Sequence, residues 1–416
     1  MSQKVNLPKQ GLGKMGVLSK LDEALTKEPD VLRGNMSCYA MKGTEDMVDV
    51  VSQAYQKYFF LNGVARRFFP GLQDLEADVT GMASNILSGG ADGIVANITS
   101  GGTESIFCAL HAAREWAKET KPHIKEPEIV APYSIHATFS KGCQYLGIKI
   151  VRVPVRDDWR ADAVAIEAAI SPNTIMIAGS APSWPYGVID NMDELAEVSK
   201  KHDLWLHVDA CVGGYLSPFV SKLGIDLPKW DFSVDGVHSI SADLHKYGYA
   251  AKGISTIAWR SEELQKYHFV SPTDWPCSPY ITQAFTGSRP ASAVAAAWAA
   301  LSYLGEDGYI AYADRAMKAK ARLIEGLNKI EGIEPIDTDL LIVVYGAKDI
   351  RVEQIVGGLS EKGWTSGGVM DPPLAHLVLD PLSEDVVDIY LEDLRAVVDS
   401  IRAGEASAEG TLSYAD

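Results

Sequence analysis

Lys246 has the sequence neighbours of a reactive amine. It follows His245 directly, inside the segment SISADLHKYGYAAKGIS at 239–255, in which most residues are small or polar. If folding removes this lysine from water, its pKa falls and its amine becomes a nucleophile that can form a Schiff base with an aldehyde. The alternative is a Lys-Tyr-Gly turn exposed to solvent. We take Lys246 as the first candidate for covalent chemistry.

The segment TSGGTES at 99–105 is a candidate phosphate loop. It places two glycines and several hydroxyls just before a helical pattern. Backbone N–H groups and the positive end of a helix are suited to a phosphate, and Gly102 and Thr103 stand at that position. The alternative is an ordinary helix N-cap built on Thr103. The segment is not a Walker loop, because no Gly-Lys-Ser/Thr follows.

Asp209 ends the strongly apolar run LWLHVDA. A carboxylate at the carboxyl end of a sheet strand lies where α/β enzymes bind their ligands. There it could face a protonated ring nitrogen, or it could merely cap the following turn. Lys246 follows 37 residues later, which favours a shared site. His207, in the same run, is interpreted as a core histidine.

Short apolar runs alternate with helical patterns from Ile94 onward. The expected strands are 129–131, 150–153, 174–178, 204–208 and 255–259, and the expected helices are 47–58, 104–117, 161–169 and 192–202. This alternation is typical of βαβ units and a mostly parallel sheet.

An Ala-rich helix begins at Ala291 and leads to a second alternation. Strands are expected at 340–345 and 377–379, and helices at 352–362 and 385–402. We therefore divide the chain into an N-terminal arm and helix at 1–60, a large domain at 61–290 and a small C-terminal α/β domain at 291–416.

Composition disfavours several classes of partner. The 416 residues carry 38 basic and 55 acidic side chains, a net charge of -17, which disfavours nucleic acid and anionic membranes. The five cysteines form no Cys-x-x-Cys pair, so we expect free thiols in the cytoplasm and no metal site. The N-terminus lacks the apolar core of a signal peptide, and no apolar run approaches the roughly 18 residues that span a bilayer.

Several motifs together resemble one enzyme family. They are HKYGY at 245–249, HVDACVGG at 207–214, FPG at 69–71 followed by Glu76, TSGGTES at 99–105, GSAPSWPYGVID at 179–190 and TGSRP at 286–290. In this order and spacing they resemble the PLP-dependent group II decarboxylase superfamily, where PLP is pyridoxal 5'-phosphate. The match is closer to its sphingosine-1-phosphate lyase branch, and it covers roughly residues 35–416.

The resemblance implies the PLP-dependent transferase fold (fold type I), an α/β fold. Its large domain has a mostly parallel seven-stranded sheet and binds the cofactor. PLP would be bound through a Schiff base to Lys246, and Asp209 would keep its pyridine nitrogen protonated. Gly102, Thr103 and His245 would contact its phosphate.

The resemblance also assigns the two faces of the cofactor ring and a partner subunit. Cys211 would pack on one face of the ring and His136 on the other, although a lone histidine after a strand is more often a surface residue. Ser288, in TGSRP, would reach the PLP phosphate of the partner subunit, unless this segment is only a turn. The implied assembly is a homodimer with shared active sites.

The substrate-binding pattern of the lyase branch is only partly present. Tyr39 and Lys252 match it. Asn62-Gly63-Val64-Ala65 stands where the branch has Asn-Pro-Leu-His, and Trp184-Pro185-Tyr186-Gly187 where it has Tyr/Phe-Pro-His-Gly, so two histidines are replaced. Arg66 could supply a guanidinium for a phosphate or carboxylate, or be a solvated surface charge. We expect a small-molecule amine or amino-acid substrate, bound by Trp184, Tyr186 and these cations.

Two reactions are compatible with these cofactor-binding and substrate-binding residues. The first is retro-aldol cleavage of a phosphorylated or carboxylated β-hydroxy amine, which gives an aldehyde and an amine. The second is decarboxylation of an amino acid. Lys246, His136 or Tyr249 would move the protons in either case. A scaffold without activity is the third reading, and the intact Lys246, Asp209 and His136 disfavour it.

Overall fold

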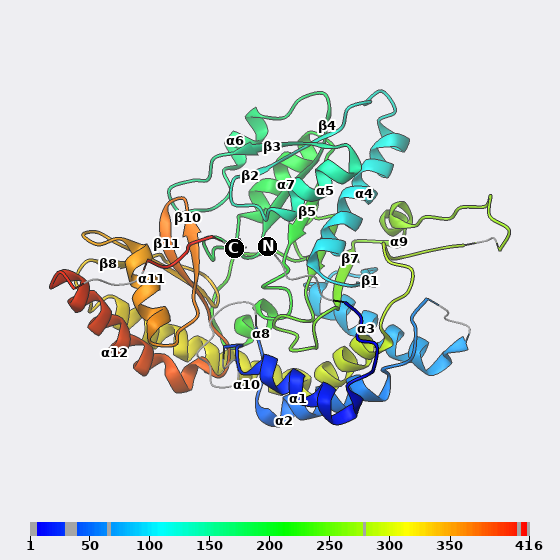
Figure 1. Cartoon of the computed structure of the whole chain (residues 1–416). Coiled ribbons are helices and arrows are strands. Elements are labelled where there is room, and N and C mark those ends of the chain that lie inside the picture. The colour runs from blue at the N-terminus through cyan, green and yellow to red at the C-terminus, as the bar shows by residue number, and fades with distance from the viewer. Residues whose placement is uncertain (1–5, 30–39, 65–67, 278–279, 406–408, 414–416) are drawn as a thin grey trace.

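A seven-stranded sheet forms the centre of the fold (Figure 1). The computed structural model describes residues 6–29, 40–64, 68–277, 280–405 and 409–413. In the order β1-β7-β6-β5-β4-β2-β3, β7 runs antiparallel to both of its neighbours and the other pairs are parallel. Its strands are β1 (Val95–Thr99), β2 (Glu128–Pro132), β3 (Lys149–Val153), β4 (Thr174–Ser180), β5 (Trp205–Asp209), β6 (Ser239–Ala242) and β7 (Ser255–Trp259).

Side chains of the central strands alternate between two buried clusters. In β5, Leu206 and Val208 pack in one cluster and Trp205 in the other, as the period of two along a strand requires. Helix α4 (Gly102–Thr120) contributes to the cluster of Trp205, and α7 (Met192–Lys201) to the cluster of Leu206. The sheet is therefore covered on both faces, which is the usual environment of parallel strands.

A smaller antiparallel sheet lies toward the C-terminus (Figure 1). Its order is β10-β11-β9-β8, with β8 (Ile333–Pro335), β9 (Ile342–Ala347), β10 (Gly367–Met370) and β11 (Pro373–Val378). The remaining helices are α1 (Gly13–Leu25), α2 (Glu45–Lys57), α3 (Pro70–Leu87), α5 (Thr138–Leu146), α6 (Ala163–Ala168), α8 (Ser217–Lys222), α9 (Glu262–Gln265), α10 (Ala291–Leu327), α11 (Val352–Glu361), α12 (Ser383–Arg402) and a 3-10 turn at Lys266–His268.

Helix α10 connects the parts of the chain that carry the two sheets. It packs against α2, α3, α8 and α12. It is interrupted at Gly305, whose φ of 55° lies in the left-handed region that glycine adopts without strain. The domain boundaries at 60 and 290 stay predictions.

The predicted fold class is confirmed: an α/β fold with a mostly parallel seven-stranded sheet. The five strands predicted for this sheet are β2, β3, β4, β5 and β7, and each begins and ends within two residues of its expected range. Strands β1 and β6 of this sheet, strands β8 and β10 of the smaller sheet, and helices α1, α3, α5, α8 and α9 were not predicted. The sequence of β6, SISA, has no apolar run. The strand pairs with β5 and β7, and its buried serine hydroxyls bond to side chains of β5.

The N-terminal region contains a helix with exposed apolar side chains. Helix α1 forms within it, and none of its side chains is buried. Leu21 and Leu25, for example, are 56% and 66% exposed. Among the described residues, no helix has the length and apolarity needed to cross a bilayer.

Candidate active site

The predicted site residues surround a cavity at the carboxyl edge of the large sheet. The cavity has a volume of about 590 Å³ and lies where β4, β5 and β6 end and α4 begins. This edge is the usual ligand position in parallel α/β sheets. The predicted residues that line it are Gly102, Thr103, His136, Trp184, Asp209, Cys211, His245, Lys246 and Lys252.

The candidate phosphate loop joins β1 to the N-terminus of α4. Ser105 fixes this turn to the sheet: its hydroxyl contacts that of Thr99 at 2.6 Å and that of Ser255 at 3.2 Å. Gly102 has no space for a side chain, since a Cβ there would lie 2.7 Å from Cys211 Sγ and 2.9 Å from the Asp243 oxygens. Bare backbone at a helix N-terminus therefore borders the cavity, as a phosphate site requires.

Asp209 is held at the end of β5 as a buried carboxylate, 7% exposed. Its Oδ1 accepts the backbone N–H of Cys211 at 3.1 Å and the hydroxyl of Ser241 at 3.3 Å. Burial raises the pKa of the Cys211 thiol well above its usual value, and the carboxylates of Asp209 and Asp243 add to this, so the thiol stays neutral. Asp209 is thus a carboxylate with fixed hydrogen bonds in the wall of the cavity.

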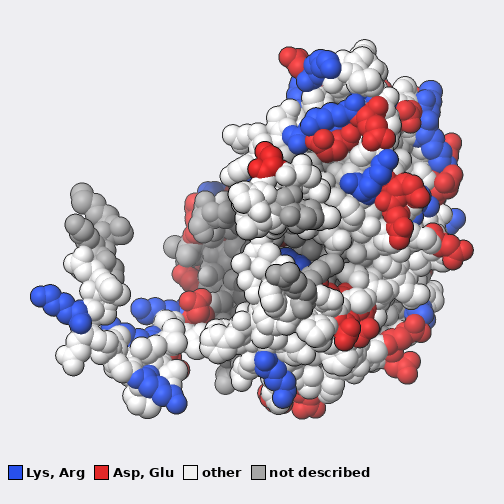
Figure 2. All heavy atoms as spheres, turned by 90° about the vertical axis from the view of Figure 1, so that its right-hand side faces the viewer, with Lys and Arg blue, Asp and Glu red and all other residues white. Residues whose placement is uncertain are grey.

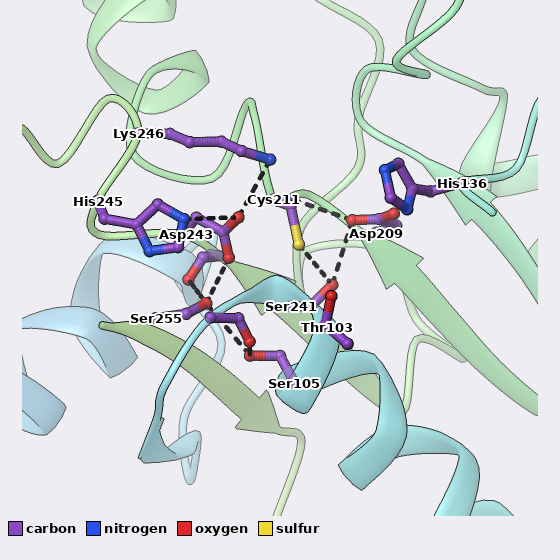
Figure 3. Close-up of polar contacts among 12 residues, drawn as sticks. Thr103, Ser105, His136, Asp209, Cys211, Ser241, Asp243, His245, Lys246 and Ser255 are labelled. Carbon is purple, nitrogen blue, oxygen red and sulfur yellow. Dashed lines mark hydrogen bonds and ion pairs between the residues drawn. The ribbon is translucent and has the colours of Figure 1, made fainter. Parts of the chain in front are cut away.

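Lys246 lies beside a carboxylate that sequence reasoning missed. Its Nζ is 3.1 Å from Oδ2 of Asp243, which is 3% exposed (Figure 3). Burial lowers the pKa of Lys246, but the carboxylate of Asp243, with Cys211 and Asp209, raises it to a net value above the usual one. The expected lowering of this pKa is therefore wrong for the amine in this structure, because burial brings an opposite charge with it.

The two histidines of the cavity have assigned tautomers. The backbone N–H of Thr138 donates to His136 Nδ1 at 3.1 Å, so in the neutral ring the proton is on Nε2. Burial lowers the pKa of His136, which keeps this ring neutral near pH 7. His245 Nδ1 donates to the carbonyl of Ile254 at 2.7 Å, which leaves Nε2 facing Asp243 at 3.7 Å.

Trp184 and Lys252 also reach the cavity. The Nζ of Lys246 lies 5.8 Å from the Trp184 ring centroid, and the ring also packs against His376 at 4.8 Å. Lys252 donates from Nζ to the carbonyl of His245 at 2.7 Å. A tryptophan face and an ammonium group therefore border the space beside Lys246.

Three predicted residues lie outside the residues that line this cavity. Tyr249 adopts φ 55°, and its ring is buried against Tyr312 at 5.1 Å. Tyr186 is 3% exposed and donates its hydroxyl to the carbonyl of Asp371 at 2.8 Å. Ser288 is exposed, and its Oγ accepts from Nδ2 of Asn62 at 3.0 Å. Sequence adjacency to the motifs did not determine where these side chains point.

Tyr39 and Arg66, also predicted as substrate-binding residues, lie outside the described residues. Residues missed by the sequence reasoning include Asp243, Glu104, Lys141 and Phe285, all of which line the cavity. Asp243 and Glu104 stood inside the quoted motifs, three residues before Lys246 and directly after Thr103. Both are acidic residues in segments of mostly small or uncharged residues. An acidic residue in such a segment is the sequence signal by which they could have been predicted to line the site.

The residues present fit PLP, the cofactor that the sequence resemblance implies. The glycine backbone at the start of α4 suits a phosphate, the buried Asp209 suits a protonated pyridine nitrogen, and Lys246 is an amine for an aldehyde. All three border one cavity. Among the described residues, no group of three or more His, Cys, Asp or Glu side chains is arranged to hold a metal ion.

Comparison with known proteins identifies the family. The model of the pyridoxal-dependent decarboxylase conserved domain matches residues 65–344. A sphingosine-1-phosphate lyase of Arabidopsis thaliana is 38% identical over 98% of this chain and 76% of its own length. Sphingosine-1-phosphate lyase 1 of Rattus norvegicus is 39% identical over 95% of this chain and 70% of its own.

A more distant relative and two solved structures extend this comparison. A probable L-tyrosine/L-aspartate decarboxylase of Methanothermobacter thermautotrophicus is 31% identical over 79% of this chain and 88% of its own. The structure of a Burkholderia pseudomallei sphingosine-1-phosphate lyase superposes with a TM-score of 0.92 at 29% identity, covering 97% of this chain and 94% of that one. Glutamate decarboxylase of Lactobacillus brevis, with a TM-score of 0.83 at 20% identity over 96% and 95%, shares the fold. The chain therefore belongs to the pyridoxal-dependent decarboxylase family of PLP enzymes, and its relatives there include the sphingosine-1-phosphate lyases.

Proposed function

We propose that this protein is a PLP-dependent carbon–carbon lyase. It cleaves the Cα–Cβ bond of a β-hydroxy amine that carries a phosphate or a carboxylate, and it releases an aldehyde and an amine. The observation that carries the proposal is the identity of 38–39% to sphingosine-1-phosphate lyases along nearly the whole chain. The cavity with Lys246 and Asp209 supports the same chemistry.

The residues that would hold the cofactor follow from their positions. Lys246 would bind its aldehyde, Asp209 its ring nitrogen, and Gly102, Thr103 and His245 its phosphate. Cys211 and His136 would contact the two faces of the ring. Bound PLP supplies an electron sink for the pair of electrons left when a bond to the substrate Cα breaks.

Two side chains of the cavity are placed to handle protons. Lys246, paired with Asp243 at 3.1 Å, is an ammonium that can donate a proton to the amine-side carbon after the aldehyde leaves. The Nε2–H of His136 can donate a hydrogen bond to a substrate oxygen. Tyr249 takes no part in this proposal, because its ring is buried away from the cavity.

Lys252, Lys141 and Trp184 are the candidate substrate contacts among the described residues. The two ammonium groups would attract an anionic group of the substrate, and the indole face would pack on its carbon chain. Arg66 and Tyr39 remain predicted contacts from the sequence.

A product assay tests the reaction. The holoenzyme is incubated with phosphorylated β-hydroxy amines and with β-hydroxy amino acids, and aldehyde and carbon dioxide are measured separately. We expect aldehyde in a one-to-one ratio with the amine product. Carbon dioxide without aldehyde would overturn the lyase in favour of an amino-acid decarboxylase. That second function is favoured by the 31% identity to the archaeal protein named as a probable decarboxylase.

We also propose a homodimer with shared active sites. Ser288 is exposed and lies outside the cavity of its own chain, so it is available to a second subunit. Large apolar side chains such as Phe60 and Phe285 are 91% and 73% exposed. Figure 2 shows many charged side chains on the upper right part of this face and fewer among the described residues nearer its centre. Full activity retained on dilution to a monomer would rule this out.

We also propose a cytoplasmic location. The described cysteines, Cys108, Cys143, Cys211 and Cys277, are free thiols, which supports it.

A further inference from the structure

Asp243 is a buried carboxylate whose hydrogen-bonding partners all come from the cavity and its floor. It follows β6 directly and is 3% exposed. Its Oδ2 lies 3.1 Å from Lys246 Nζ, and its Oδ1 accepts the hydroxyl of Ser255 at 2.5 Å. Figure 3 shows the carboxylate of Asp243 between Lys246, His245 and Ser255.

A carboxylate as buried as that of Asp243 needs a positively charged or hydrogen-bonding partner. The groups around it show which of three roles it has: phosphate ligand, metal ligand or counter-ion. The Asp243 side chain is itself an anion and offers a phosphate no positive charge, so it is no phosphate ligand. Among the described residues it belongs to no cluster that could hold a metal ion. Within the part of the chain that the structure describes, Lys246 is the only ion-pair partner that brings Asp243 a full positive charge, because His245 is farther away at 3.7 Å and burial lowers the pKa of its ring.

We propose that Asp243 is the counter-ion that holds Lys246 as an ammonium whenever the amine is not bonded to the cofactor. Asp243 is thus a positioning residue that acts through Lys246. The ion pair between Asp243 and Lys246 is present in the structure of this chain. Its effect on turnover rests on the proposed function.

The other charged and titratable groups around the pair leave Asp243 as the dominant partner. Asp209 on β5 faces the cavity from the other side and bonds Cys211 and Ser241. The Cys211 thiol is neutral, since burial raises its pKa. His136, His245 and Lys252 also interact with the charge of Lys246, but two are rings whose pKa burial lowers and the third is a cation, so none of them stabilises an ammonium. Glu104 and Lys141 also line the cavity, and the Glu104 carboxylate bonds the backbone of Ser100, Phe285 and Thr286.

Because of the ion pair, Lys246 Nζ can accept the protons that an incoming substrate amine loses. A substrate amine arrives as an ammonium and would give up one proton before its nitrogen attacks the cofactor carbon and a second proton once that bond has formed. The bond from that carbon to Lys246 Nζ would break in the same exchange, and Nζ, which carries one hydrogen in the protonated imine, would take both protons and leave as an ammonium. Asp243 favours this direction of exchange because it stabilises the charged form of the amine that leaves.

Competitive labelling of the full chain tests the proposal without turnover, because it measures the pH at which the Lys246 amine loses its proton. The protein is freed of cofactor with hydroxylamine, acetylated with trace acetic anhydride between pH 7 and 11, and the labelling of each lysine is quantified by mass spectrometry. Lys229, an exposed lysine, is the internal reference. We expect the midpoint of Lys246 labelling to lie at higher pH than that of Lys229. In Asp243→Asn it falls below that of Lys229, and the free-amine fraction at pH 8 rises at least about tenfold, the ratio that one pKa unit represents.

Two further variants and one spectrum make the test decisive. Ser255→Ala removes a hydrogen bond and keeps the charge, so it moves the Lys246 midpoint less than Asp243→Asn. Asp235→Asn, at an ion pair with Lys200 on the surface, moves it not at all. In the holoenzyme the pH midpoint of the visible absorption band also falls in Asp243→Asn. An unchanged Lys246 midpoint in folded Asp243→Asn overturns the proposal, whereas an enzyme that makes no aldehyde overturns only the proposed function.

Discussion

The carboxylate of Glu104 accepts the backbone N–H of Phe285 at 2.6 Å. The same side chain accepts the backbone N–H of Ser100 at 2.7 Å and that of Thr286 at 3.3 Å, and it is 6% exposed. Glu104 therefore ties the segment that ends in Ser288 to the loop at the start of α4. Both segments contribute side chains to the cavity.

Removing this tie is expected to loosen both the cofactor and the substrate. In Glu104→Ala three backbone N–H groups lose their acceptor, and each hydrogen bond to a charged group contributes about 1.5–3 kcal/mol. We expect PLP to dissociate faster and KM to rise more than kcat falls. Stopped-flow absorbance and steady-state assays of aldehyde release measure these effects. Glu115→Gln, on the same helix but away from the cavity, serves as the control, and equal effects in both variants would contradict the assignment.

Lys246 is expected to be indispensable for turnover and dispensable for folding. We expect Lys246→Ala to lower kcat by at least about a thousandfold, within the range that general acid–base groups contribute. The circular dichroism spectrum should stay unchanged. In the wild-type protein, borohydride should fix the cofactor to the peptide that contains Lys246. Lys229→Ala is the matched control, and retained turnover in Lys246→Ala would mean that the nucleophile is another residue.

The charge of Asp209 is expected to matter more than the hydrogen bonds that hold it. Asp209→Asn keeps the shape of the side chain but cannot stabilise a protonated ring nitrogen, so we expect kcat to fall about a hundredfold or more. Ser241→Ala removes only the hydroxyl that donates to Oδ1 at 3.3 Å and should lower kcat by less than about tenfold. Single-turnover assays measure both. A larger loss in Ser241→Ala than in Asp209→Asn would contradict the proposed role.

Acid is expected to destabilise the fold through His207. Its ring is fully buried between the hydroxyls of Ser239 and Ser241, and burial lowers its pKa to about 4. The unfolded chain binds a proton at this residue near pH 6.5, before the native chain does. Stability is therefore full above pH 6.5 and declines as the pH falls toward 4, by up to about 3 kcal/mol.

Urea unfolding of the wild-type protein and of His207→Gln between pH 7.5 and 4.5 tests this sign. The variant is expected to lose stability less steeply over this interval, whatever its stability at neutral pH. His123→Gln, at an exposed histidine, should keep the wild-type slope. Parallel curves for the wild type and His207→Gln would show that this ring does not titrate as expected.

Much of the large sheet could be predicted because its strands are buried on both faces. Such strands are continuous apolar runs, as in LWLHVDA at 204–210, and they are readable without tertiary information. The glycines of TSGGTES and the Lys246 motif were readable for a similar reason, since their residue types are set by local chemistry. Strand β6 was not readable, because Ser239 and Ser241 are buried by hydrogen bonds to Trp205, His207 and Asp209 that span about 30 residues of chain.

The sequence by itself determined the family, the sheet and the main residues around the cavity, because motif order and apolar runs are properties of the chain. Only the tertiary structure decided which way each side chain faces. Tyr249 stands three residues after Lys246 and yet turns into an aromatic cluster, and Asp243 stands three residues before it and faces its amine. The charge state of Lys246 follows from that second placement. Burial alone favours the neutral amine, and a carboxylate 3.1 Å away reverses this.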